Sequence, residues 1–460
     1  MRKIVLTVFT AALILLGAGC LGGSGVQIKP IILEYWRLDD SPDVLAPAIE
    51  AYRKIHPNVT INVRSFRSDE YEKSLLEALA EDRGPDMMSL PNVWMTSWKP
   101  KLLPAPEKTV IPTQVIDQQK KKIVAINQET KTITIREIKN LFVEAVENDV
   151  IMLTVPGNRN EKPVDAIWGL PYSLDTLAVF YNIDLLRRAD IKEPPDTWKK
   201  LQDQVKKLTV LDKDEKIQQS GAAIGTAQNI RHSTDLMTAI MMQNGAIMAD
   251  EYGRIEFDSQ PPNSGGRLYP PGVEALMFYQ SFGRPNSSTY TWDNKLPDSM
   301  DAFIQGKTAF YFGFPYDRTE IEQRAPQLNF EVAALPQVNP AKVRNIAHYS
   351  IEVVSNKTSH PNEAWNFIQF AAEADNVRDF LAATNRPTTL RSLISEQLTD
   401  PEAKPFVSQV LTAESWYRGK DWSKVETAFD TMLETYPTIE DPSYQRIVTA
   451  AAREVAQTIN

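Results

Sequence analysis

The stretch WGLPYSLDTLAVFYNIDLLRRADIKEPPDTW, residues Trp168–Trp198, carries the strongest structural signals in the sequence. Its continuous apolar run, Leu177–Tyr181, predicts a strand that is buried on both faces. Thr197 has the position of an N-cap, and the apolar spacing after it predicts a helix over residues 198–208. Asp175 is a lone carboxylate just before the strand, where a charge is costly unless it is paired or contacts a polar ligand.

The residues before this stretch alternate between strand and helix patterns. Apolar or alternating segments at 30–36, 59–63 and 86–90 predict strands, and amphipathic segments at 44–52 and 71–79 predict the helices between them. This alternation is typical of a parallel α/β sheet with helices on its faces. Such sheets bind ligands at the carboxyl ends of their strands, so the loops after the strands are expected to hold the site.

Length and charge bound the function. A chain of 460 residues exceeds the size that one hydrophobic core usually serves, so two large domains are expected. The formal net charge of −9 argues against nucleic acid or an anionic membrane surface as the main partner. The histidines, at 56, 232, 348 and 360, show no metal-ligand spacing, so neither a metal site nor a cofactor is expected.

Residues 1–28 are expected to form a lipoprotein signal peptide and a flexible tether. A basic start precedes an apolar run over residues 4–16, which is too short to span a membrane comfortably as a mature helix. Residues 16–20, LGAGC, resemble a lipobox, in which the cysteine is acylated and becomes the new N-terminus. Gly17 departs from the leucine usual at its position, and the alternative is an ordinary secretory signal with a chance cysteine. Lipidated Cys20, the single cysteine, would anchor the protein outside the cytoplasm to the cell membrane.

Several blocks resemble one known family. The opening stretch is similar to the G-L-P-Y…D…Y-N-x-D-L…P-P-x-T-W block of the extracellular solute-binding proteins, the maltose-binding-protein-like receptors of ABC importers. Residues 302–309, AFIQGKTA, are similar to the A-F-x-x-G-K-T-A block of the same family. The resemblance covers about residue 29 to the end, with an expanded segment at 99–165. Within that segment a polar hairpin is expected to turn at residues 127–131.

The resemblance implies a two-lobed α/β fold in which each lobe is a sheet flanked by helices and the ligand cleft lies between the lobes. It implies an N-terminal lobe of residues 29–173 and 340–384, and a C-terminal lobe of residues 177–335 and 390–460. The connections near 173–177, 335–340 and 384–389 would then be hinges. It further implies a monomeric receptor without enzymatic activity that delivers a small solute to the transmembrane subunits of an ABC permease.

The resemblance also implies which residues line the cleft. Aromatic rings stack on the apolar face of a sugar, and carboxylates bind its hydroxyls through charge-assisted hydrogen bonds. The candidates are Trp36, Asp39, Asp40, Asn92, Trp94, Tyr172, Asp175, Asn229, His232, Asp235, Tyr316, His348, Tyr349 and Trp416. Among these, Tyr316 takes the place of a stacking tryptophan, and Asp40 and Asp175 match ligand-binding acids of the family.

Other interpretations stay open. The aromatic candidates can be core residues, and the aspartates can cap a helix or satisfy a backbone turn. A carbohydrate is the favoured solute, and a polyol phosphate or a peptide is the alternative. The chain can also be a lipoprotein adhesin or a glycoside hydrolase, which needs two carboxylates that flank one bond. Asp40, Asp175 and Asp317 could be paired in this way, but no local motif marks a general acid.

Overall fold

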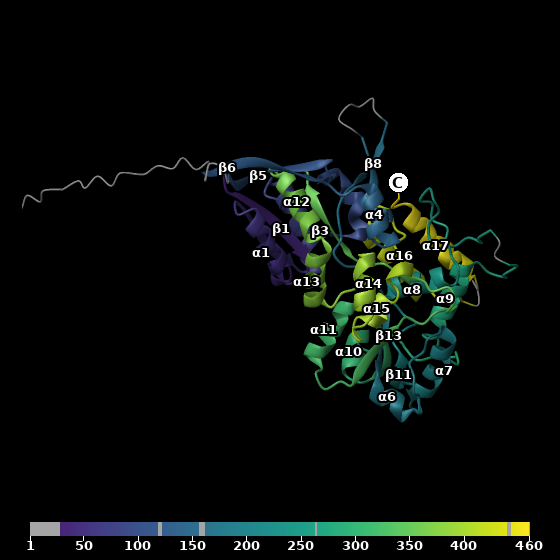
Figure 1. Cartoon of the computed structure of the whole chain (residues 1–460). Coiled ribbons are helices and arrows are strands. Elements are labelled where there is room, and N and C mark those ends of the chain that lie inside the picture. The colour runs from purple at the N-terminus through teal and green to yellow at the C-terminus, as the bar shows by residue number, and fades with distance from the viewer. Residues whose placement is uncertain (1–27, 118–121, 156–161, 263–264, 439–442, 460) are drawn as a thin grey trace, which may run out of the picture.

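The structure, a computed structural model, describes residues 28–117, 122–155, 162–262, 265–438 and 443–459 (Figure 1). The predicted signal peptide and Cys20 lie outside these ranges. The described chain forms two α/β halves, each built on a five-stranded sheet. Figure 1 shows one half around β1, β3 and α12 at the upper left and the other around β11, β13 and α7 at the lower right. No helix in the described ranges is long and apolar enough to cross a membrane.

The first sheet has the strand order β2–β1–β3–β15–β4. Its strands are β1 (Ile31–Leu38), β2 (Val59–Phe66), β3 (Met87–Pro91), β4 (Leu102–Leu103) and β15 (Ser350–Ser355). As predicted, β1 is parallel to both β2 and β3, whereas β15 returns antiparallel to β3. The helices of this half are α1 (Ala46–Ile55), α2 (Ser68–Ala80), α3 (Met95–Trp98), α4 (Ile135–Leu141), α5 (Glu144–Val150), α12 (Pro361–Ala371), α13 (Ala374–Thr384) and α14 (Arg391–Gln397).

Local signals explain how the first helices begin. Ser41 accepts a hydrogen bond from the backbone N–H of Asp43, and a 3₁₀ turn over Pro42–Leu45 leads directly into α1. Pro47 falls in the first turn of α1, where proline is tolerated because its missing N–H would have no partner within the helix. Periodic burial of tyrosine and leucine side chains then holds α2 against the sheet.

The second sheet has the strand order β10–β11–β12–β9–β13. Its strands are β9 (Ala178–Asn182), β10 (Val210–Leu211), β11 (Ile217–Ala222), β12 (Thr308–Gly313) and β13 (Phe330–Ala334). The prediction of a buried strand at 177–181 is confirmed, since β9 lies between β12 and β13 and only Tyr181 is partly exposed. The helices are α6 (Ile183–Arg188), α7 (Trp198–Leu208), α8 (Ser233–Gln243), α9 (Pro271–Ser281), α10 (Ser299–Ile304), α11 (Pro315–Arg324), α16 (Trp422–Glu434) and α17 (Tyr444–Ala456).

An antiparallel ribbon corrects one prediction. Strands β5 (Lys108–Asp117) and β6 (Lys122–Lys131) pair along their full lengths, so residues 127–131 lie within β6 and do not form the turn. A two-stranded ribbon exposes one face, and its strands therefore tolerate the polar residues that indicated a turn. The ribbon lies along α12, where Asn362 accepts a hydrogen bond from the backbone N–H of Val110 at 3.1 Å. Smaller elements are β7 (Ile151–Thr154), β8 (Val164–Ile167), β14 (Asn345–Ile346), β16 (Ala413–Glu414) and 3₁₀ turns at Asn92–Trp94, Lys99–Lys101 and Val410–Thr412.

The chain passes between two hydrophobic cores at three places. Leu174 packs in the first core and Leu177 in the second. The second crossing lies at Ile346 and Ala347, later than the expected 335–340. Residues beyond the expected third crossing at 384–389 still pack in the first core as far as Ala413.

The short helix α15 (Lys404–Val407) joins the two halves. Val407 packs in the first core, whereas Phe406 contacts Phe180 of β9 with ring centroids 6.1 Å apart. Tyr417 is the next residue to enter the second core.

Candidate ligand-binding cleft

A cavity of about 1210 Å³ lies between the two halves and is lined by residues from both. The first half contributes the loop after β1, part of α2 and the residues that follow β3. These are the carboxyl ends of parallel strands, where an α/β fold places ligands. The second half contributes the segment before α8, the first two turns of α11 and the start of α16.

Most of the predicted site residues meet at this cavity. Its lining includes Asp39, Asp40, Trp94, Asp175, His232, Tyr316, His348 and Tyr349. They come from both halves and from the first two crossings between the cores. The remaining candidates do not line the cavity and instead contact other side chains or the backbone.

Three aromatic candidates pack on other side chains and do not line the cavity: Tyr172 is buried, and Trp36 and Trp416 are partly buried against the two cores. Trp36 stacks in a tilted arrangement on Phe66, with ring centroids 4.5 Å apart. Tyr172 is 1% exposed and packs edge-to-face on Phe380. Trp416 lies within the aromatic cluster of the second half, 6.2 Å from Phe429.

The other polar candidates hold backbone or neighbouring side chains. Asn92 donates hydrogen bonds to Asp149 at 3.3 Å and to the backbone carbonyl of Ala347 at 3.2 Å. Asn229 donates to two backbone carbonyls of the loop after Trp292 and accepts from the indole N–H of that residue. Asp235 lies behind the lining, with a carboxylate oxygen 3.9 Å from Nδ1 of His232.

A chain of buried ion pairs leads from the first sheet to the cavity. Arg37 on β1 is 1% exposed and pairs with Glu352 at 3.1 Å and with Asp40 at 2.7 Å. Asp40 also pairs with Arg386 at 3.0 Å. The Nε of Arg386 lies 3.9 Å from Oδ2 of Asp175. The loop after β1 and the segment after α13 are therefore tied together at the cavity wall.

Among the residues of these ion pairs, Asp175 is a buried carboxylate with one oxygen that no hydrogen bond from the described residues reaches. Its side chain is 3% exposed, and its Oδ1 atom has no hydrogen-bond partner among the described residues. Burial raises the pKa of Asp175 to about 6; Arg386 acts in the opposite direction, and Asp40 and Asp317 add to the rise. An unpaired acceptor in the lining of a cavity is a group that a ligand can satisfy.

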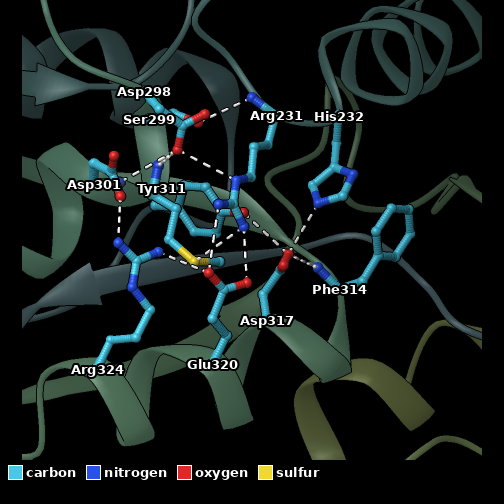
Figure 2. Close-up of polar contacts among 11 residues, drawn as sticks. Arg231, His232, Asp298, Ser299, Asp301, Tyr311, Phe314, Asp317, Glu320 and Arg324 are labelled. Atoms are coloured by element: carbon cyan, nitrogen blue, oxygen red, sulfur yellow. Dashed lines mark hydrogen bonds and ion pairs between the residues drawn. The ribbon is translucent and has the colours of Figure 1, made fainter. Parts of the chain in front are cut away.

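The wall from the second half is a dense polar network (Figure 2). His232 lies 3.0 Å from Asp317, which also accepts hydrogen bonds from the backbone N–H of Phe314 and the hydroxyl of Tyr311. His232 has a left-handed backbone with a φ of 60°, a costly conformation for a non-glycine residue that is typical of functional sites. Burial disfavours the charged imidazole, but the charge and hydrogen bond of Asp317 outweigh it and raise the pKa of His232.

Arg231, which also lines the cavity, extends this network to α10 and α11. Its guanidinium pairs with Glu320 at 2.9 Å and with Asp298 at 3.2 Å, and Arg324 pairs with Glu320 and Asp301 (Figure 2). These pairs join α11 to the residues at the start of α10 and before α8. The network therefore fixes the backbone on which His232 and Asp317 stand.

Aromatic rings line opposite sides of the cavity. In the first half, Trp94 stacks on Trp98 with centroids 6.0 Å apart and an interplanar angle of 13°. In the second half, Tyr316 stacks on Phe314 at 5.6 Å, and Trp422 also lines the cavity. Rings held by neighbours in this way offer flat apolar faces at little cost in conformational entropy.

Sequence reasoning missed several lining residues. The resemblance places Arg386 in a hinge, and the sequence offers Asp317 only as a carboxylate of the glycoside hydrolase alternative. Trp422 and Glu426 are four positions apart, so they share one face of α16, and this spacing was a usable signal. Burial raises the pKa of Glu426 to about 7, and the negative charges of Asp235 and Asp430 add to the rise. In the described ranges, no group of His, Cys, Asp or Glu side chains could hold a metal ion.

Asp175→Asn is expected to change how stability depends on pH. The pKa of Asp175 is higher in the folded protein, about 6, than the roughly 3.9 of an unfolded chain, so its charged form destabilises the fold. This contribution lowers the free energy of unfolding of the wild type as pH rises from about 4 to about 7. Asparagine cannot ionise, so the variant should gain stability relative to the wild type over this range. Urea unfolding at pH 4.5 and 7.5, with the exposed Asp214→Asn as control, checks this; equal differences at both values would contradict it.

Sequence comparisons place the chain among binding proteins. Residues 38–378 match the family described as bacterial extracellular solute-binding protein. The chain is 26% identical over 216 residues to a binding protein of Brucella abortus, covering 45% of this chain and 47% of that protein. It is 25% identical over 277 residues to the maltodextrin-binding protein MdxE of Bacillus subtilis, covering 57% and 60%. These matches thus span about half the length of the curated relatives.

Solved structures agree on the fold. The cyclic α-maltosyl-1,6-maltose binding protein of Arthrobacter globiformis superposes with a TM-score of 0.69 at 17% identity, covering 93% of this chain and 99% of that one. A solute-binding protein of Thermotoga lettingae bound to α-D-tagatose gives 0.64 at 18% identity, covering 94% and 100%. The predicted two-lobed α/β fold is confirmed by this likeness. Since the family match covers most of its length, the chain belongs to the bacterial extracellular solute-binding proteins.

Proposed function

We propose that the protein is the receptor of an ABC importer and binds a carbohydrate between its two lobes. The observation that carries the proposal is the cavity of about 1210 Å³, in which Trp94 faces the site from one half and Tyr316 and Trp422 from the other. The same lining includes carboxylates, the guanidinium of Arg386 and the imidazole of His232. A pyranose has apolar faces and a rim of hydroxyls, and this lining complements both.

The energies are adequate for a transport receptor. Each stacking contact contributes about 0.5–1.5 kcal/mol beyond the burial of its area. Two or three such contacts, with several charge-assisted hydrogen bonds, can reach the roughly −8 kcal/mol of micromolar affinity. The name of the Bacillus subtilis relative, a maltodextrin-binding protein, supports the same solute class.

The test is a thermal-shift screen of the purified protein against neutral, cationic and anionic sugars, polyol phosphates and peptides. A carbohydrate should raise the melting temperature most and be recovered unchanged after long incubation. Turnover in proportion to protein concentration, abolished by Asp175→Asn, would indicate a glycoside hydrolase. Peptide binding without sugar binding would indicate a peptide receptor, and failure of every solute would favour an adhesin. Polyol phosphates are disfavoured because carboxylates outnumber basic groups in the lining.

Ligand binding is expected to close the lobes. We assign residues 28–174 and 347–413 to one lobe and residues 177–346 and 417–459 to the other, following the two cores. A ligand that contacts both walls favours the closed form by its differential affinity. Solution scattering should show a smaller radius of gyration with saturating ligand, and a sugar that does not bind is the control. An unchanged radius with confirmed binding would argue for a rigid, preformed pocket.

We also propose that Cys20 anchors the receptor to the cell membrane, outside the cytoplasm, where it meets its permease. Cys20 is the only cysteine, so Cys20→Ser should abolish acyl labelling and leave the protein unprocessed or released. Metabolic labelling with a fatty-acid analogue, followed by fractionation, measures both effects. Equal labelling of the variant would contradict the lipid anchor.

A further inference from the structure

The cavity has a marked excess of negative charge. Its acidic lining residues are Asp39, Asp40, Glu72, Asp175, Asp317, Glu320, Asp421 and Glu426. Its basic lining residues are Arg231, Arg386 and Lys420. A neutral ligand would leave this excess uncompensated.

Two of the three basic lining residues already form ion pairs with other carboxylates, and the third is exposed at one end of the cavity. Arg231 pairs with Glu320, which also lines the cavity, and with Asp298. Arg386 pairs with Asp40 at 3.0 Å, much closer than its 3.9 Å approach to Asp175. Lys420 is exposed at the end of the cavity near α16.

The imidazoles of His232 and His348 do not neutralise all of the carboxylates that line the cavity. His232 lies 3.0 Å from Asp317 but 3.9 Å from Asp235, so a positive charge on its ring mainly compensates Asp317. Burial lowers the pKa of His348, which keeps that ring neutral near pH 7. The charged groups that act on Glu426 are Asp235 and Asp430, and both are negative.

Asp175 gives a second observation, separate from the excess of negative charge, that points to a ligand. Its carboxylate is almost completely buried, lines the cavity and has one oxygen without any hydrogen-bond donor among the described residues. A buried acceptor normally has a donor, and Arg386, 3.9 Å from the other oxygen, does not supply one to this atom. The negative charges of Asp317, Asp175 and Asp235 add to the effect of burial in raising the pKa of the Tyr316 hydroxyl, and Tyr316 lines the same cavity as Asp175 and Asp317.

We propose that the ligand is an amino sugar, a carbohydrate with a protonated amine, and that Asp175 and Glu426, which both line the cavity, hold its positive charge. This inference rests on the proposed carbohydrate-binding function. An ammonium group donates three hydrogen bonds and forms charge-assisted contacts about twice as strong as neutral ones. An anionic sugar would meet like charges, and an N-acetylated sugar would leave the carboxylates without a counter-charge.

The pH dependence follows from the same groups. The carboxylates must be ionised to bind an ammonium, and the pKa values of Asp175 and Glu426 are raised to about 6 and about 7. Affinity for an amino sugar should therefore rise from pH 5 to pH 7, with release of protons on binding. A neutral sugar that accepts hydrogen bonds from the protonated acids would show the opposite trend.

The experiment compares glucosamine, galactosamine and mannosamine, and their oligomers, each with its N-acetylated counterpart. Calorimetry at pH 5 and pH 7, in two buffers of different ionisation enthalpy, gives affinity and proton release. The amine is expected to bind at least about tenfold more tightly at pH 7, the effect of one charge-assisted hydrogen bond. High salt should reduce this preference.

Variants test the assignment of the acidic wall. Asp175→Asn and Glu426→Gln should each reduce the ratio of amine to N-acetyl affinity, whatever they do to the affinities themselves. Glu193→Gln, an exposed change of the same chemistry outside the cavity lining, should leave the ratio as in the wild type. Melting temperatures of all variants without ligand establish that each is folded.

The outcomes separate the two proposals. If an N-acetylated, neutral or anionic sugar binds as tightly as the amines, the amino-sugar inference is wrong and the carbohydrate receptor stands. An unchanged ratio in both acidic variants would also overturn the inference. If no carbohydrate of any charge binds, the proposed function and the inference both fail.

Discussion

Glu352→Ala is expected to lower the free energy of unfolding by about 3–5 kcal/mol, the cost of breaking a buried ion pair from one side. Glu352 lies on β15 in the first sheet and is 1% exposed. It accepts hydrogen bonds from Tyr35 and Ser89, both at 2.5 Å, and pairs with Arg37 at 3.1 Å. Alanine would leave a buried guanidinium with one counter-charge and two buried hydroxyls without their acceptor.

The matched control for this prediction is Glu331→Ala. Glu331 also lies on a strand and also accepts a hydrogen bond from a tyrosine, Tyr181, but it is exposed to water. Its loss should cost about 1 kcal/mol or less, since an exposed hydrogen bond is replaced by water. Urea unfolding of both variants measures the difference. Similar losses would mean that the buried pair does not stabilise the first sheet.

The second large effect is expected on ligand binding. Tyr316→Ala should weaken binding of the identified sugar by about 1–3 kcal/mol, through lost stacking and lost burial of apolar area. Tyr316 is partly exposed at the cavity, and its ring stacks on Phe314 at 5.6 Å. The apo protein should lose only the roughly 0.5–1.5 kcal/mol of that aromatic pair and some burial.

Tyr316→Trp should keep or improve binding because a larger flat face serves a sugar ring equally well. Tyr252→Ala, which removes an exposed tyrosine of the second half outside the cavity lining, should change neither affinity nor melting temperature appreciably. Calorimetry and apo melting temperatures of all variants give the answer. If the alanine variant at 316 melts far lower, by the equivalent of about 3–5 kcal/mol, yet binds normally, Tyr316 is a core residue.

The sequence alone determined those features of the fold that depend on the spacing of apolar residues within short segments. The alternation of apolar segments up to residue 90 predicted a parallel β1–β2–β3 core, and the run at 177–181 predicted a buried central strand. These features depend on periodicity between near neighbours, which one sequence displays directly. The block resemblance added the two-lobed fold and part of the cavity lining, including Asp40 and Tyr316.

Tertiary structure alone decided which way individual side chains face. Trp36 lies within β1 and Trp94 follows β3, yet the first packs on Phe66 and the second lines the cavity. Likewise, Asn92 is drawn to Asp149, far along the chain. Arg386 reaches the cavity because Asp40, more than 300 residues earlier, lies 3.0 Å away. Such choices depend on groups that only folding brings together, since a buried polar side chain turns toward whichever partner satisfies it.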